Sequence, residues 1–180
     1  MKRIVMTLRR HGRLISLLMA FGALGLGLMA VLMGQVLSLS ACHLCIFQRV
    51  IHFAIGLVLL LVFWSWRLKI LALISLASAA GLSIWGMVAS GQQSWMQWFP
   101  ESGFSCVISD PGLTEQLINA LGELYPLFFM ATGSCASKDL VIFGLSLANW
   151  SFMAFMAFLA GCVALIFSRI ANTIHERING

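Results

Sequence analysis

The sequence predicts an all-α membrane protein in which four transmembrane helices form a single bundle without a separate soluble domain. Of its 180 residues, 61% are hydrophobic and only 9% are charged, which leaves too little polar surface for a water-soluble domain. Four apolar runs are each long enough to cross about 30 Å of hydrocarbon. The basic residues behind the net charge of +5 form no single patch, so they do not indicate a surface for nucleic acid.

The first apolar run, about 14–37, contains no charged residue. It exceeds the roughly 7 to 15 apolar residues of a signal-peptide core, so we expect a transmembrane helix that is retained. Four crossings return both termini to one side of the membrane, and the short connection between the second and third helices makes them antiparallel neighbours. The later runs cover about 46–66, 70–89 and 140–167.

Basic residues next to the apolar runs predict the orientation. Nine of the eleven lie before the first run, between the second and third, or after the fourth, and basic residues in short loops stay cytoplasmic. We therefore expect both termini, including the tail 168–180, to be cytoplasmic, and the loops 38–45 and 91–139 to face the opposite side. The nine residues are Lys2, Arg3, Arg9, Arg10, Arg13, Arg67, Lys69, Arg169 and Arg177.

The long second outer loop has a helix signal of its own. Asp110 suits the N-cap position and Pro111 the first helical position, and leucines then recur at helical spacing until Pro126. We expect a short amphipathic helix whose apolar stripe rests on the membrane surface or on the bundle, although it lacks the Lys/Arg face usual for surface helices. The leucines are Leu113, Leu117, Leu121 and Leu124.

Four of the five cysteines fall in the predicted outer loops, whereas Cys162 lies within the fourth apolar run. Outer loops of a bacterial membrane protein face an oxidising compartment, so four cysteines there are most simply two disulfide bonds. Cys162 lies among alanine and glycine and is expected to be a buried small residue. The outer cysteines are Cys42 and Cys45 in the first loop and Cys106 and Cys135 in the second.

The first pair, Cys42 and Cys45, forms a C-x-x-C motif at the entrance to the second helix. Two intervening residues allow the sulfurs to meet in a small ring, and a helix N-terminus favours the thiolate, which is the attacking species. A structural disulfide would instead close a long loop, because its stabilising effect grows with loop length. We therefore predict that the disulfide of this pair exchanges with other thiols.

Arg49 and His52 share a predicted helix face with Cys45. An arginine about one turn inside an apolar run is costly and usually marks a site. We expect Arg49 to favour the Cys45 thiolate and to offer hydrogen bonds to a lipid-soluble electron acceptor; the alternative is an arginine that snorkels to the surface. His52 is expected to make a core hydrogen bond, because nothing nearby completes a metal site.

The second pair, Cys106 and Cys135, spans the predicted amphipathic helix and is flanked by glycine and serine. It could be a structural disulfide, but beside an exchangeable C-x-x-C motif a relay partner is the better explanation, because disulfides exchange through mixed intermediates. A zinc site is disfavoured because only one of the two pairs is short. A lipidated Cys42 is disfavoured because another membrane helix follows at once.

Three segments carry a family resemblance. They are C-H-L-C-I-F-Q-R at 42–49, Pro100 shortly before Cys106, and F-M-A-T-G-S-C at 129–135. With four helices and two outer cysteine pairs, the chain resembles along nearly its whole length the DsbB family of membrane oxidases, which regenerate the soluble oxidant DsbA. The resemblance implies a multi-pass protein of the bacterial inner membrane with its active cysteines on the periplasmic side. It also implies a bound quinone, ubiquinone or menaquinone, and a DsbA-like partner of thioredoxin fold.

The resemblance further implies an order of electron flow. A thiolate of the DsbA-like partner would attack Cys106 and release Cys135. Cys135 would then attack Cys42, and the freed Cys45 would hand electrons to a quinone held near Arg49. Such a relay needs a terminal acceptor more oxidising than DsbA, and a quinone can be one.

One segment departs from the family pattern. Some relatives carry a histidine shortly before the position of Pro100, whereas this chain has Gln92 and Gln93. The resemblance therefore does not extend to a second polar contact with the quinone from this segment.

The leading hypothesis is an enzyme, a protein-disulfide:quinone oxidoreductase that sustains disulfide bond formation. The same residues would also suit a specialised paralogue with one dedicated substrate. A second class is a non-catalytic membrane protein whose disulfides are structural, but such disulfides need no arginine below a C-x-x-C motif. A transporter or proton relay would need acidic residues within the helices, and the four apolar runs contain none.

Overall fold

The computed structural model describes residues 2–37, 42–99, 116, 123 and 141–179. Its long helices are α1 (Lys2–Val36), α2 (His43–Trp64), α3 (Lys69–Trp98) and α6 (Leu147–Asn179). Each contains a stretch long and apolar enough to cross a membrane, and the stretches are His11–Val36, His43–Trp64, Lys69–Trp98 and Leu147–Ala171. The predicted bundle of four long apolar helices is confirmed.

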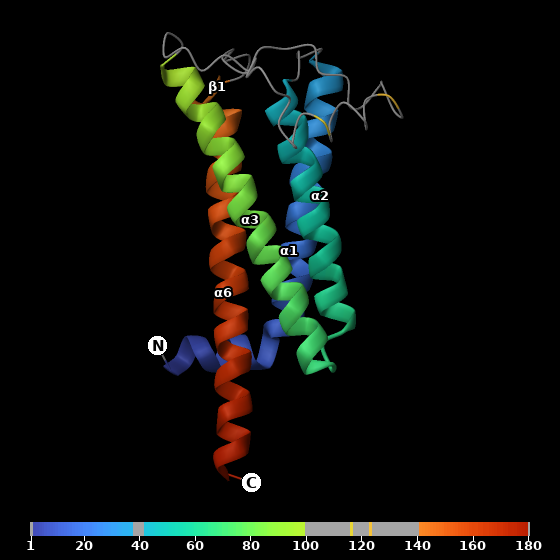
Figure 1. Cartoon of the computed structure of the whole chain (residues 1–180), viewed down its shortest axis with the longest axis vertical. Helices are drawn as coiled ribbons and strands as arrows, with labels where there is room; N and C mark the ends of the chain where they lie inside the picture. The colour runs from blue at the N-terminus through green and yellow to red at the C-terminus, as the bar shows by residue number, and fades with distance from the viewer. Residues whose placement is uncertain (1, 38–41, 100–115, 117–122, 124–140, 180) are drawn as a thin grey trace.

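The helices pack in the ring order α1, α2, α3, α6, because α2 contacts α1 and α3 while α6 contacts α3 and α1. Figure 1 shows α1 and α2 side by side, with α3 running obliquely from the top of α6 to the foot of α2. One hydrophobic core lies between them, and α2 is the most buried helix. The largest fully buried core side chains include Phe155, Ile46, Ile55, Leu59, Leu76 and Leu165.

Two glycines mark close approaches between neighbouring helices. A Cβ on Gly56 of α2 would lie 2.6 Å from the Leu24 side chain of α1. On the other side of the bundle, a Cβ on Gly86 of α3 would lie 2.6 Å from the Phe155 ring of α6. Small residues at such positions let membrane helices approach closely, and van der Waals packing then drives their association. The pairs α1–α2 and α3–α6 are thus fitted to each other by shape.

Both chain termini lie toward the same end of the bundle, and the first residues of α1 run across that end (Figure 1). Arginine–aromatic contacts occur there: the Arg13 guanidinium lies 4.3 Å from the centroid of the Phe63 ring. The Arg169 guanidinium lies 4.3 Å from the Trp66 centroid and donates to the Trp66 carbonyl oxygen at 2.9 Å. Because cation–π contacts are attractive, the Arg13 contact ties α1 to α2, and the Arg169 contact ties α6 to the connection between α2 and α3.

A short hairpin precedes α6. Strand β1 (Val141–Ile142) pairs antiparallel with β2 (Leu145–Ser146). Phe143 and Gly144 form the turn with φ values of 53° and 79°, and positive φ at both central residues is what a type I′ hairpin turn requires. The hairpin therefore brings the chain into α6 at Leu147.

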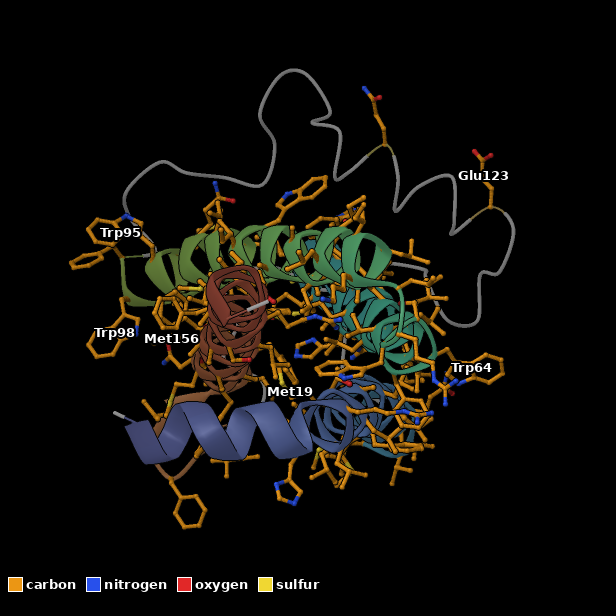
Figure 2. The ribbon with its side chains drawn as sticks, turned by 90° about the horizontal axis from the view of Figure 1, so that it is seen from below. Met19, Trp64, Trp95, Trp98, Glu123 and Met156 are labelled. Atoms are coloured by element: carbon orange, nitrogen blue, oxygen red, sulfur yellow. The ribbon has the colours of Figure 1, made fainter. Side chains whose placement is uncertain are left out.

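Large apolar side chains also cover the outside of the bundle. Figure 2 shows Trp64, Trp95 and Trp98 pointing away from the helices, and each is more than half exposed. A soluble protein rarely exposes so many large apolar side chains, whereas lipid tails are a suitable neighbour for them. The outer face therefore fits a multi-pass membrane protein.

Candidate redox site

The C-x-x-C motif forms the start of α2. Cys42 is the N-cap residue: its backbone is extended (φ −86°, ψ 166°), and its Sγ accepts a hydrogen bond from the Cys45 N–H at 3.4 Å. A sulfur here takes the place of the side-chain oxygen that usually caps a helix. The cap puts Cys45 in the first turn, where the helix dipole favours negative charge.

The two sulfurs are in direct contact. Cys42 Sγ lies 3.0 Å from Cys45 Sγ, which is well above the covalent S–S length of about 2.05 Å. Cys42 is 1% exposed, whereas Cys45 is only partly buried. The two sulfurs are therefore in contact without a disulfide bond between them, and Cys45 is the more accessible of the two.

Arg49 lies one turn beyond Cys45 and is partly buried. Its guanidinium packs against Gly34 of α1, where a Cβ would lie 2.9 Å from Nη2 and 3.3 Å from Nη1. The positive charge interacts electrostatically with both Cys45 and Cys42. Within the described residues the guanidinium makes no hydrogen bond, so its N–H groups can serve a ligand.

Helix α3 contributes a residue that the sequence did not single out as a contact of the cysteines. Gln93 donates from Nε2 to Cys45 Sγ at 2.9 Å and lies 3.6 Å from the other sulfur. Its Oε1 accepts a hydrogen bond from Gln48 Nε2 at 2.7 Å. The available signal was helical spacing, because Ser90, Gln93 and Gln97 share one buried face of a largely apolar helix.

His52 makes the core hydrogen bond expected from the sequence, with Nδ1 at 2.8 Å from the Gln48 carbonyl oxygen. Its ring centroid lies 4.2 Å from that of Phe155, and its Nε2 is buried without a hydrogen-bond partner. Cys162 is 0% exposed in α6, as expected. In the part of the chain that the structure describes, no group of three or more His, Cys, Asp or Glu could hold a metal ion.

The structure brings together three of the predicted site residues, Cys42, Cys45 and Arg49. The other two cysteines, Cys106 and Cys135, lie outside the described residues, as does the amphipathic helix expected after Asp110. The second cysteine pair therefore stays a prediction from the sequence.

The helical bundle and the cysteine pair at the start of α2 agree with one known family. The family model described as Disulfide bond formation protein DsbB matches residues 12–165, from the beginning of the first membrane span almost to the end of the fourth. The chain belongs to the DsbB family. With four candidate spans, this DsbB-family chain is a multi-pass membrane protein.

Relatives in the DsbB family are similar along most of the chain. The Disulfide bond formation protein B of Dechloromonas aromatica is 40% identical over 147 residues, which cover 82% of this chain and 87% of the relative. The protein of the same name from Nitrosomonas eutropha is 31% identical over 167 residues, covering 91% of this chain and 99% of the relative. The resemblance predicted from the sequence is confirmed, and DsbB membership implies a role in disulfide bond formation.

Proposed function

We propose that this chain is a protein-disulfide:quinone oxidoreductase of the bacterial inner membrane. It oxidises a DsbA-like periplasmic protein by thiol–disulfide exchange and passes the electrons to a membrane quinone. The observation that carries the proposal is the contact of Cys42 Sγ with Cys45 Sγ at 3.0 Å, at the start of a membrane helix and beside the charge of Arg49. DsbB family membership supports it independently.

The asymmetry of the pair supports separate roles for its two sulfurs. Attack on Cys42 Sγ breaks the Cys42–Cys45 disulfide and leaves the electron pair on Cys45. The leaving sulfur is then the one in the first turn of α2 and beside Arg49, where negative charge is favoured. We assign the attack to Cys135, after a partner thiolate has opened its bond with Cys106.

The residues beside Cys45 fit a quinone. Cys45 is partly exposed, and the Arg49 guanidinium makes no hydrogen bond within the described residues. Its N–H groups suit a carbonyl oxygen, and Gly34 gives the guanidinium room against α1. When bound, the quinone supplies an acceptor for the electrons and protons released as two thiols become one disulfide.

A reconstituted assay tests the proposal. The purified protein, mixed with a reduced DsbA-like partner and ubiquinone, should oxidise the partner and reduce one quinone for each disulfide formed. A parallel reaction with menaquinone identifies the preferred acceptor. Cys42→Ser is the matched control and should stop both half-reactions. Partner oxidation without quinone reduction would contradict the proposal, as would the absence of partner oxidation with either quinone.

A further inference from the structure

Two buried amides connect α2 to α3 beside the cysteine pair. Gln48 Nε2 donates to Gln93 Oε1 at 2.7 Å, and the Gln93 amide donates from Nε2 to Cys45 Sγ at 2.9 Å. Gln48 is 5% exposed and Gln93 is 3% exposed. A polar group buried in a membrane protein is costly unless it is hydrogen-bonded, so each glutamine depends on the other for its place in the bundle.

This hydrogen bond fixes which end of the Gln93 amide faces the sulfur. Because Oε1 accepts from Gln48, the NH₂ group at the opposite end points toward Cys45. An amide rotated by a half-turn would place its oxygen against the sulfur, and the negative end of a carbonyl dipole repels a thiolate. Gln48 thus determines that Gln93 presents its hydrogen-bond donor, and not its acceptor, to Cys45.

We propose that Gln93 is a catalytic residue that donates a hydrogen bond to the Cys45 thiolate as it forms, and that Gln48 is its positioning residue. The inference rests on the proposed function. When an incoming thiolate attacks Cys42 Sγ, a new disulfide bond forms, the Cys42–Cys45 bond breaks, and the electron pair stays on Cys45 Sγ. The donor from α3 is already in place, and a preorganised donor in a dry site stabilises developing charge without reorganisation.

Gln93 and Arg49 act on the same sulfur from different helices and by different chemistry. Arg49 brings a positive charge from α2 on a partly buried side chain that a quinone can also contact. Gln93 brings a neutral N–H from α3, and both ends of its amide are engaged by Cys45 and Gln48. Loss of the Gln93 amide should therefore destabilise the Cys45 thiolate relative to the thiol and leave quinone binding unchanged.

Alkylation of Cys45 reports the thiolate without any partner or quinone. Modification by iodoacetamide is followed by mass spectrometry on the full-length chain, and Cys162, which is 0% exposed, serves as an unmodified internal reference. Serine at the other three cysteine positions prevents disulfide formation. These positions are Cys42, Cys106 and Cys135.

Gln93→Met keeps an unbranched side chain of similar length but removes the donor. In the acid half of the pH profile, where the thiolate fraction limits the rate, this variant should alkylate about threefold to fourfold more slowly than the parent. That value combines a roughly tenfold loss of thiolate with the higher nucleophilicity of a more basic sulfur. Gln92→Met is the matched control and should react like the parent, because Gln92 is exposed on the same helix.

A double variant, Gln48→Met with Gln93→Met, covers the case in which the single variant fails to fold. It leaves neither amide buried without its partner and should show the same slowing. Gln48→Met alone should slow alkylation less than Gln93→Met, because the Gln93 amide remains but is free to turn. Parent-like rates in both Gln93→Met and the double variant would overturn the inference.

The quinone assay supplies a second readout. Gln93→Met should lower turnover while the KM for quinone stays at the parent value; a raised KM would assign Gln93 to quinone binding and overturn the inference. Alkylation needs neither partner nor quinone. A parent protein that fails to reduce quinone would therefore contradict the proposed function but not the inference about Gln93. The effect of Gln93 on the Cys45 sulfur would still be measured.

Discussion

The guanidinium of Arg49 lies against the backbone of α1 at Gly34, where a Cβ atom would be only 2.9 Å from Nη2. An arginine side chain on α2 can stay beside the cysteine sulfurs because its neighbouring helix carries no side chain at this point. Gly34 thus belongs to the site although it has no functional group of its own.

Gly34→Val should displace the guanidinium, because the added carbons would overlap both Nη atoms. We expect the KM for quinone to rise about tenfold, with little change in the KM for the partner, in steady-state assays of quinone reduction. Gly25→Val is the matched control, since nothing lies within 4 Å of a Cβ at that position. A parent-like KM for quinone in Gly34→Val would show that the contact between Gly34 and Arg49 is not needed for quinone binding.

Arg49→Ala should raise the KM for quinone by about tenfold or more, because a hydrogen bond to a charged group contributes about 1.5 to 3 kcal/mol. Arg49→Lys keeps the charge but loses the planar fork of donors, so its KM should be intermediate. Titration of ubiquinone at saturating partner measures both values. An unchanged KM in Arg49→Ala would remove Arg49 from the quinone site.

Cys45→Ser and Cys106→Ser should each abolish partner oxidation. The relay needs the Cys45 sulfur as the leaving group, and it needs the Cys106 sulfur as the atom that the partner thiolate attacks. Cys162→Ser should retain full turnover, since that thiol is buried in α6 away from the pair. Mass spectrometry of the oxidised protein should find the bonds Cys42–Cys45 and Cys106–Cys135. Intact turnover in either of the first two variants would show the relay to be wrong.

Gly86→Val should destabilise the bundle by about 1 to 3 kcal/mol, because its Cβ would lie 2.6 Å from the Phe155 ring and force α3 away from α6. Unfolding in detergent, followed by circular dichroism, measures the change. Gly81→Val provides the comparison on the same helix, as nothing lies within 4 Å of a Cβ there. Equal stability of the two variants would mean that the α3–α6 contact can relax.

Alkaline phosphatase fusions test the orientation of the spans. Fusions after Ser40 and after Asp110 should be active, because both junctions lie in loops predicted to face the periplasm. A fusion after Arg67 should be inactive, since it falls in the connection between α2 and α3. The reverse pattern would place the cysteines on the cytoplasmic side and exclude exchange with a periplasmic partner.

The four helices could be predicted because they depend only on the length of the apolar runs. The relative positions of Cys42, Cys45 and Arg49 could be predicted because they depend only on the helical period. Long apolar runs specify membrane helices, and the 3.6-residue period places Arg49 one turn below Cys45 whatever surrounds it. The hairpin before α6 had no comparable signal. Its turn combines Phe143, a residue that rarely adopts positive φ, with Gly144, inside a run that reads as continuously apolar.

The role of Gln93 could not be predicted, because helical periodicity gives the face on which a residue lies but not the neighbour that the face meets. Gln92 and Gln93 are chemically identical in the sequence, and only the packing of α3 against α2 makes one of them exposed and the other a donor to Cys45. Likewise, the unequal burial of Cys42 and Cys45 follows from the N-cap geometry, which two cysteines in a motif do not reveal.

The cysteine pair depends on side chains from two neighbouring helices: α3 supplies the amide that meets Cys45, and α1 supplies the gap at Gly34 that seats Arg49. A peptide with the sequence C-H-L-C-I-F-Q-R, grafted onto an unrelated membrane helix, would therefore carry the sulfurs and the arginine without the neighbours that contact them in this bundle. The smallest unit that could be transferred with these contacts consists of the three helices α1, α2 and α3. Any design that borrows this chemistry has to import α1 and α3 together with the motif.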